Sequence, residues 1–328
     1  MSAVAPSPTP TSTPTASRVV LGFAIANLAA QIGIIFTGGV VRLTGSGLGC
    51  STWPQCEPGS FTPVLHAESG LHPYIEFGNR LLTFVLVVVA AGLALSVWRS
   101  ASTRTRPRSL KVLALAPILG VVVQAVLGGI TVLVDLHPAV VGSHFFLSAA
   151  LVWLSTVVLW RLREGDAPAR ATLTVPERWR TWMGALPWAL GVLTAIVVVL
   201  GVLTTGSGPH SGDSEVGYRF ALDPALIARF HAVSVWAFLA VVGVSLVPVM
   251  SRRSAAGAAA AAVPAALRAR RAWIVLVVVT LAQGGIGYVQ YFTGLPIPLV
   301  SLHLLGSGLL IAAVTAAVLS LRTREQVR

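Results

Sequence analysis

Charged side chains are scarce in this chain of 328 residues. Asp, Glu, Lys and Arg together make up 10% of it, against about a quarter of an average soluble domain. The mean hydropathy of +0.81 points the same way. A water-soluble chain of this size needs more charge to cover its surface, so the composition excludes an ordinary cytosolic protein. It predicts a polytopic membrane protein.

Acidic residues are the scarcer charged class, with 11 Asp and Glu against 23 Lys and Arg, which gives a net charge of +12. In a soluble protein this excess would suggest nucleic acid as a partner. Here nearly all the basic residues fall in alternate loops between apolar runs, as the positive-inside rule describes. We therefore expect no nucleic-acid partner.

Cysteine is almost absent. Cys50 and Cys56 are the only two, too few for a disulfide scaffold or a four-thiolate metal site. A single bridge between them is the favoured interpretation. Zinc binding by both cysteines with His66 and His72 is the alternative, although this spacing matches no standard zinc motif.

The first 17 residues carry no charged side chain and are rich in Pro, Ser and Thr. They lack the basic start and short apolar core of a signal peptide. We predict a disordered cytoplasmic tail over residues 1–18.

Apolar runs of bilayer-spanning length fill the rest of the chain, which predicts an all-α membrane protein of eight transmembrane helices. The runs cover residues 19–41, 75–98, 111–134, 139–160, 183–205, 225–250, 272–292 and 297–321. We divide the chain into an N-terminal half, a cytoplasmic linker, a C-terminal half and a cytoplasmic tail, at 19–160, 161–182, 183–321 and 322–328.

Basic residues predict the orientation of these spans. They concentrate in the loops 98–111, 161–182 and 251–271 and in the C-terminal tail, which places those segments and both termini in the cytoplasm of a cell-membrane protein. The intervening loops then face outward, where oxidising conditions permit a disulfide.

An internal repeat relates the two halves. Gln124 and Gln283 lie 159 positions apart, and Gly128 and Gly287, and His144 and His303, keep the same offset. The motif Leu-Thr-Gly-Ser-Gly that ends the first span also has a counterpart, Thr-Thr-Gly-Ser-Gly, at the end of the fifth. We therefore predict two pseudo-symmetric four-helix bundles in parallel orientation.

Four polar residues share one depth in the even-numbered spans. Each follows a proline that starts its helix, by five to seven positions, so all four lie roughly 8–10 Å inside the outer helix ends. They are Asn79, His144, His231 and His303.

Imidazoles at one depth on facing helices are the arrangement that a haem requires. A single such histidine more often packs against a neighbouring helix through a carbonyl hydrogen bond. Four positions in matching register favour a haem-binding role, because polar groups are costly in lipid.

Charged residues near this depth have two interpretations each. Glu76 lies on the helical face of Asn79 and is either catalytic or a structural ion-pair partner of Arg80 at i+4, and the two roles are compatible. Arg42, Arg80 and Arg229 are candidate contacts for haem propionates, or they reach lipid phosphates.

These motifs together resemble the haem A synthases. The resemblance is carried by Gly38-Gly39-Val40-Val41-Arg42-Leu43-Thr44-Gly45-Ser46-Gly47-Leu48-Gly49-Cys50, by Trp53-Pro54-Gln55-Cys56, by Ile75-Glu76-Phe77-Gly78-Asn79-Arg80, and by the helix-borne His144, His231 and His303. It extends from about residue 19 to residue 321.

The resemblance implies oxidation of a methyl group of haem O to the formyl group of haem A, by two successive hydroxylations, for the assembly of aa3-type terminal oxidases. It implies a haem B cofactor ligated by His231 and His303, and a substrate haem facing His144 in the N-terminal half, with both haem sites toward the outer face. Glu76 would be the catalytic carboxylate, and Cys50 and Cys56 an outer-loop disulfide. Haem O synthase and oxidase assembly factors would be partners; the electron acceptor stays open.

Asn79 departs from the pattern of the haem A synthases, which have His at this position. Because an amide is a poor iron ligand, we predict that the substrate iron has one axial imidazole, from His144, and an open or water-occupied opposite face. Two other function classes remain: a di-haem electron-transfer protein of the cytochrome b type, and a transporter with repeated halves.

Overall fold

A computed structural model describes residues 16–64, 70–210, 212, 213, 215, 217–251 and 263–325. Eight helical segments in these ranges are long and apolar enough to cross a membrane, when α3 and α4 are taken as one span. This confirms the predicted all-α membrane fold. The helices are α1 (Arg18–Leu43), α2 (His72–Arg99), α3 (Arg108–Leu113), α4 (Ala116–Leu133), α5 (Pro138–Arg163), α6 (Glu177–Ser207), α7 (Pro224–Met250), α9 (Val263–Phe292) and α10 (Ile297–Ser320).

The third span is broken, where the sequence predicted one continuous helix over 111–134. Helix α3 ends at Leu113, and α4 begins at Ala116 with Pro117 in its first turn. Proline has no N–H to donate to the preceding turn, and its ring clashes there, so the helix stops and restarts. A proline also occupies the first turn of α2, α5, α7 and α10, as predicted.

Several helices extend beyond their apolar runs into the basic segments. Helix α6 begins at Glu177 and α9 at Val263, so the predicted loops 161–182 and 251–271 are shorter than expected. Arginine is a good helix former whose long side chain reaches water from a helix end, and apolarity alone therefore underestimates helix length. The predictions for the tail up to residue 15 and for residues 252–262 lie outside the described residues, as does His66.

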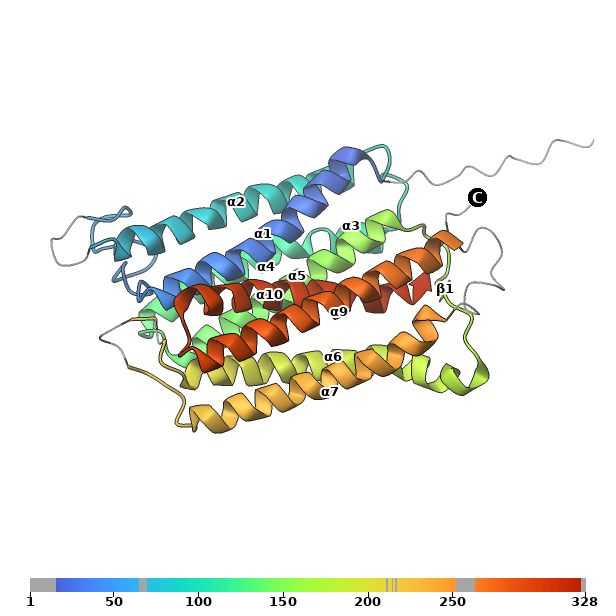
Figure 1. Cartoon of the computed structure of the whole chain (residues 1–328). Coiled ribbons are helices and arrows are strands. Elements are labelled where there is room, and N and C mark those ends of the chain that lie inside the picture. Colours follow the sequence, from blue (N-terminus) through green and yellow to red (C-terminus); the bar gives the residue numbers. More distant parts are fainter. Residues whose placement is uncertain are drawn as a thin grey trace, which may run out of the picture.

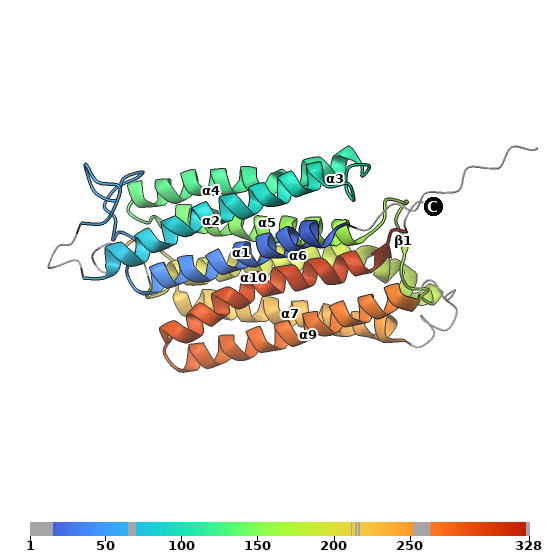
Figure 2. The same ribbon diagram turned by 90° about the horizontal axis from the view of Figure 1, so that it is seen from above.

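The helices run side by side, and the two ends of the described chain lie at the same end of the bundle (Figure 1). The loop between α1 and α2 lies at the opposite end with the loop between α6 and α7. Helices α2 and α4 border one side of the bundle and α7 and α9 the other, while α1, α5, α6 and α10 lie between them (Figure 2).

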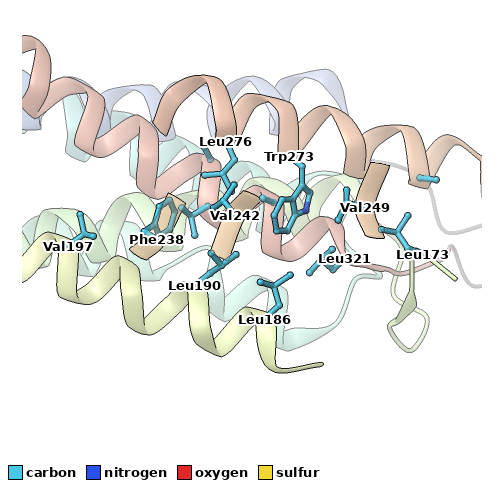
Figure 3. Close-up of a cluster of buried hydrophobic side chains, with 14 residues drawn as sticks. Leu173, Leu186, Leu190, Val197, Phe238, Val242, Val249, Trp273, Leu276 and Leu321 are labelled. Carbon is cyan, nitrogen blue, oxygen red and sulfur yellow. The ribbon is translucent and has the colours of Figure 1, made fainter. Parts of the chain in front are cut away.

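Apolar packing holds the halves together and fills the C-terminal half. Ile32 and Ile35 of α1 pack with Val152 of α5 and Ile311 of α10 in one buried cluster. A larger cluster in the C-terminal half surrounds Trp273 and Phe238, which are 0% and 2% exposed (Figure 3). Burying such side chains stabilises each by about 1.5–3 kcal/mol. The halves are therefore joined through their inner helices.

Polar contacts join segments that are far apart in the chain at both ends of the bundle. At the end that holds the termini, strand β1 (Arg170–Ala171) pairs antiparallel with β2 (Arg322–Thr323). At the other end, the N–H of Gly47 donates to the carbonyl of Gly212, 2.8 Å away. The sequence predicted neither contact, because both join segments far apart in the chain.

Candidate functional site

One cavity of about 1720 Å³ contains the predicted site residues of both halves. Small-molecule pockets usually measure about 300–1,000 Å³, so this one has room for more than one large ligand. Its lining is mainly apolar, with a few polar side chains, as expected of a cofactor site. Those polar residues include Arg42, Glu76, Asn79, Arg80, His144, Arg229, His231 and His303.

In the C-terminal half, His231 of α7 faces His303 of α10. Their ring centroids are 6.4 Å apart and the rings are nearly perpendicular, at 80°. A metal–imidazole bond is about 2 Å long and a ring nitrogen lies about 1 Å from the ring centre, so two imidazoles on opposite sides of one metal ion have centroids about 6 Å apart. The spacing of this histidine pair thus fits axial ligation of one iron.

A hydrogen bond fixes the tautomer of His231. Its Nδ1 lies 3.1 Å from the carbonyl oxygen of Val197 on α6. Since a carbonyl only accepts, Nδ1 carries the proton and Nε2 keeps its lone pair, which is the state that binds a metal. The buried Nδ1 atoms of His303 and His144 have no hydrogen-bond partner among the described residues.

Glycines on neighbouring helices make room for all three imidazoles. A Cβ atom added at Gly201 of α6 or Gly287 of α9 would lie 3.3 Å from Cε1 of His231 or His303 respectively. The same atom at Gly128 of α4 would lie 3.1 Å from Cε1 of His144. Because Cβ atoms seldom approach carbon so closely, glycine at these positions sets where each ring can lie.

In the N-terminal half, Glu76 is buried and bonded on both carboxylate oxygens. Oε2 accepts from the backbone N–H of Cys50 at 2.7 Å, and Oε1 accepts from Nε of Arg80 at 3.0 Å. The predicted ion pair with Arg80 at i+4 is therefore present. These donors hold the carboxylate at the cavity wall and compensate the cost of burying its charge.

Asn79 and His144 are two further polar residues that line this half of the cavity. The hydroxyl of Thr37 on α1 donates to Oδ1 of Asn79 at 2.8 Å. The amide Nε2 of Gln124 on α4 donates to the carbonyl oxygen of His144 at 3.1 Å. Gln283 makes the matching bond to His303 at 2.9 Å, in the register of the repeat.

The three candidate arginines differ in how far they are already engaged. Arg80 also donates to the carbonyl oxygens of Gln55 and Thr52, and Arg42 donates to those of His210 and Thr205. Arg229 is exposed at the cavity and forms no hydrogen bond or ion pair with any residue that the structure describes. It is thus the arginine with the most donors left for an anionic ligand.

The outer loop contacts the cavity through Glu76 and Arg80, which bond to the backbone of Cys50 and Gln55. Cys50 and Cys56 form a disulfide, as favoured from the sequence, so neither offers a thiolate to zinc. Nδ1 of His72 instead lies 2.8 Å from the hydroxyl oxygen of Ser46. Within the described ranges, no three His, Cys, Asp or Glu side chains gather as a metal site.

The sequence profile of the COX15-CtaA family, described as "Cytochrome oxidase assembly protein", matches residues 22–315. That range includes every site residue described above and all of the helices except the first turn of α1 and the last residues of α10. The chain belongs to this family.

Curated relatives of this COX15-CtaA protein include three bacterial proteins named "Heme A synthase". The one from Lysinibacillus sphaericus is 30% identical over 192 residues, 57% of this chain and 58% of that protein. Those from Halalkalibacterium halodurans and Bacillus licheniformis are 32% and 28% identical over 127 and 155 residues, 38% and 47% of this chain and 40% and 48% of each relative. The chain spans about half the length of the curated relatives it matches.

Some contacts in the site of this COX15-CtaA protein could not be found in the sequence. Thr37 and the carbonyl of Val197 orient Asn79 and His231, yet neither belongs to a pattern. Trp53 of the outer loop packs against Gly129 of α4, and only the loop's folding brings it there. By contrast, the sequence did show that Gly128 and Gly287 are separated by the same 159 positions as His144 and His303, and this shared offset indicated that each glycine belongs with its histidine.

The glycine at position 287 provides a test of the histidine geometry. We expect Gly287→Ala to weaken haem binding in the C-terminal half about three- to tenfold, because the new methyl group pushes the His303 ring by a few tenths of an ångström. Gly243→Ala on α7 is the matched control, since Gly243 does not line the cavity and a Cβ there meets nothing within 4 Å. Both substitutions replace glycine by alanine within a helix, so they raise the helix propensity by the same amount. Haem titration of the two purified variants, followed by absorbance, checks this; equal affinities would contradict it.

Proposed function

We propose that this protein oxidises a methyl group of haem O to the formyl group of haem A. The C-terminal half, 183–321, holds haem B through His231 and His303, and the N-terminal half, 19–160, holds the substrate. The observation that carries this proposal is the histidine pair at 6.4 Å in the same cavity as a buried carboxylate and a third imidazole. The family and the names of the relatives agree with it.

Haem B in the C-terminal half would supply one-electron redox chemistry. The residues around it keep the cofactor fixed: the carbonyl of Val197 orients His231, and Gly287 leaves space for the His303 ring. Two fixed ligands suit a group that exchanges electrons but does not leave. Arg229 is our candidate for one of its propionates.

The N-terminal half would hold the substrate less symmetrically. His144 would bind the iron, whereas Asn79 would not, because an amide is a poor iron ligand and its Oδ1 already accepts a hydrogen bond from Thr37. Glu76 stabilises positive charge developing at the reacting methyl carbon, or holds the water that attacks it. Arg80 and the Cys50 N–H position that carboxylate.

The orientation that we propose places both termini in the cytoplasm and the haem sites toward the outer face. Its support is the concentration of Lys and Arg at the end of the bundle that holds the termini, and the disulfide at the opposite end (Figure 1). The substrate would come from a haem O synthase, and the product would serve oxidase assembly.

Co-expression with a haem O synthase in a host without haem A tests the activity. Pigments extracted from the membranes are separated by chromatography, and we expect haem A only when this chain is present. A fixed content of two haems with no haem A would instead indicate a di-haem electron-transfer protein, and a colourless purified protein would favour a transporter.

Asn79 supports a spectroscopic prediction. We expect Asn79→His to convert the substrate haem from a one-imidazole to a two-imidazole state, because the new side chain offers a ring nitrogen where an amide stood. The measurement is the absorption and EPR spectrum of the substrate-loaded variant. Asn79→Ala is the control and should keep the parental spectrum. An unchanged spectrum in Asn79→His would count against an open face at the iron.

A further inference from the structure

The cavity reaches the outer surface of the helix bundle in both halves. Two sets of four apolar lining residues, one in each half, are exposed on the side of the bundle, each residue with 45–70% of its surface accessible; Phe61, Tyr291 and Phe292, at the outer-loop end of the bundle, also line the cavity and are exposed. The first set lies on α2 and α4 and the second on α7 and α9. They are Leu81, Phe84, Val122 and Val126, and Val233, Trp236, Leu281 and Tyr288.

The two openings occupy equivalent places in the repeat. Phe84 and Trp236 lie 152 positions apart, as do Leu81 and Val233, and this is the offset between Asn79 and His231. Val122 and Leu281 lie 159 positions apart, the offset between His144 and His303. Each opening therefore has the same relation to the polar residues of its own half.

A hydrogen bond crosses only one of the openings. Nε1 of Trp236 on α7 donates to the hydroxyl of Tyr288 on α9, at 2.9 Å. The counterparts in the N-terminal half are Phe84, which has no donor, and Gly129, which has no side chain. Among the described residues, no side-chain hydrogen bond joins α2 to α4.

This difference affects how easily each opening widens. Separating α7 from α9 leaves an indole N–H and a phenol hydroxyl without partners against lipid, which costs more than losing apolar contacts. Between the outer loop and the break in the third span, separating α2 from α4 breaks no side-chain hydrogen bond between the described residues of these two helices, and lipid tails replace the dispersion contacts that are lost. The N-terminal opening is therefore the one suited to exchange.

We propose that the substrate passes between the lipid bilayer and the cavity through the opening between α2 and α4, and that the Trp236–Tyr288 hydrogen bond closes the equivalent route and retains the cofactor. The inference rests on the proposed function, which places a substrate in one half and a resident haem in the other. The occupant is a lipid-dissolved tetrapyrrole with carboxylate groups: the apolar rim accommodates its ring, while Arg42 and Arg80 provide cationic groups inside the cavity.

The closed opening is tested by the rate at which haem leaves the C-terminal half. Full-length protein is mixed with excess apoglobin, and haem transfer is followed by absorbance. We expect Trp236→Phe and Tyr288→Phe each to speed transfer about five- to tenfold, the effect of one lost hydrogen bond. The double variant should match either single one within about twofold, since both remove the same bond.

Trp188→Phe is the matched control, because Trp188 is an exposed tryptophan of α6 that does not line the cavity. Its transfer rate should equal that of the parent. Unchanged rates in Trp236→Phe and Tyr288→Phe, or equal acceleration in Trp188→Phe, would overturn the role of the hydrogen bond.

The open route is tested by the rate of filling the N-terminal half. Haem B in phosphatidylcholine vesicles is the probe, and the absorbance change that disappears in His144→Ala reports that site. We expect Val122→Trp to slow filling at least fivefold by narrowing the rim. Val123→Trp, an exposed neighbour outside the cavity lining, should change it less than twofold. Equal rates in both variants would overturn the route.

The two proposals fail in different ways. If the parent protein shows no binding that depends on His144, the substrate site itself is wrong, and the route falls with it. If binding is normal but insensitive to Val122→Trp, only the route is wrong. If the route between α7 and α9 carried the traffic instead, Trp236→Phe would speed filling of the His144 site, which also contradicts the inference.

Discussion

Replacing Glu76 by glutamine is expected to lower the rate of haem A formation by at least about 100-fold, the usual scale for a lost charge or general base at a reacting centre. The amide keeps the size of the side chain but removes the negative charge that we propose to act on the reacting methyl group. Haem B should stay bound, because His231 and His303 come from other helices. Chromatography of pigments from cells that also express a haem O synthase measures the rate.

Glu177→Gln is the control for this experiment. Glu177 pairs with Arg180 at i+3, as Glu76 pairs with Arg80 at i+4, but it is an exposed residue at the start of α6. An exposed pair contributes little to stability, so this variant should make haem A at the parental rate. If Glu76→Gln also made haem A at the parental rate, the carboxylate of Glu76 would serve only to hold Arg80 and the outer loop.

The second large effect is expected at the histidine pair. His303→Ala should weaken haem B binding by at least about 100-fold, because it removes one of two axial ligands rather than a residue that orients one. His231→Ala should do the same. The haem content and absorption spectrum of each purified variant provide the measurement.

Two further variants give this test its controls. His137→Ala removes an exposed imidazole that does not line the cavity, and should leave the haem content unchanged. His144→Ala should abolish substrate binding while haem B stays bound. Loss of haem B in His144→Ala, or its retention in His303→Ala, would contradict the assignment of the two halves.

Much of the site could be located in the sequence because helix geometry converts position into depth. A rise of 1.5 Å per residue from a proline at the helix start placed Asn79, His144, His231 and His303 at one level, and all four line one cavity. The i+4 spacing of Glu76 and Arg80 likewise predicted their contact. Such relations depend only on one helix at a time.

Other features could not be predicted because they depend on how helices rotate and pack against one another. Sequence spacing does not say that Val197 accepts from His231, or that Trp236 reaches Tyr288 across two helices. Helix lengths were also underestimated at α6 and α9, and the break at Pro117 was missed, since apolarity alone does not define where a helix ends.

The amino-acid order alone determined that this chain lies in a membrane, that it crosses eight times, and that its histidines share a level, because the bilayer selects apolar spans and a helix has a fixed rise. Tertiary structure decided which of those residues face each other, that one cavity joins both halves, and that a hydrogen bond between Trp236 and Tyr288 joins α7 to α9. Those outcomes depend on side chains from separate helices meeting, which only the packed bundle defines.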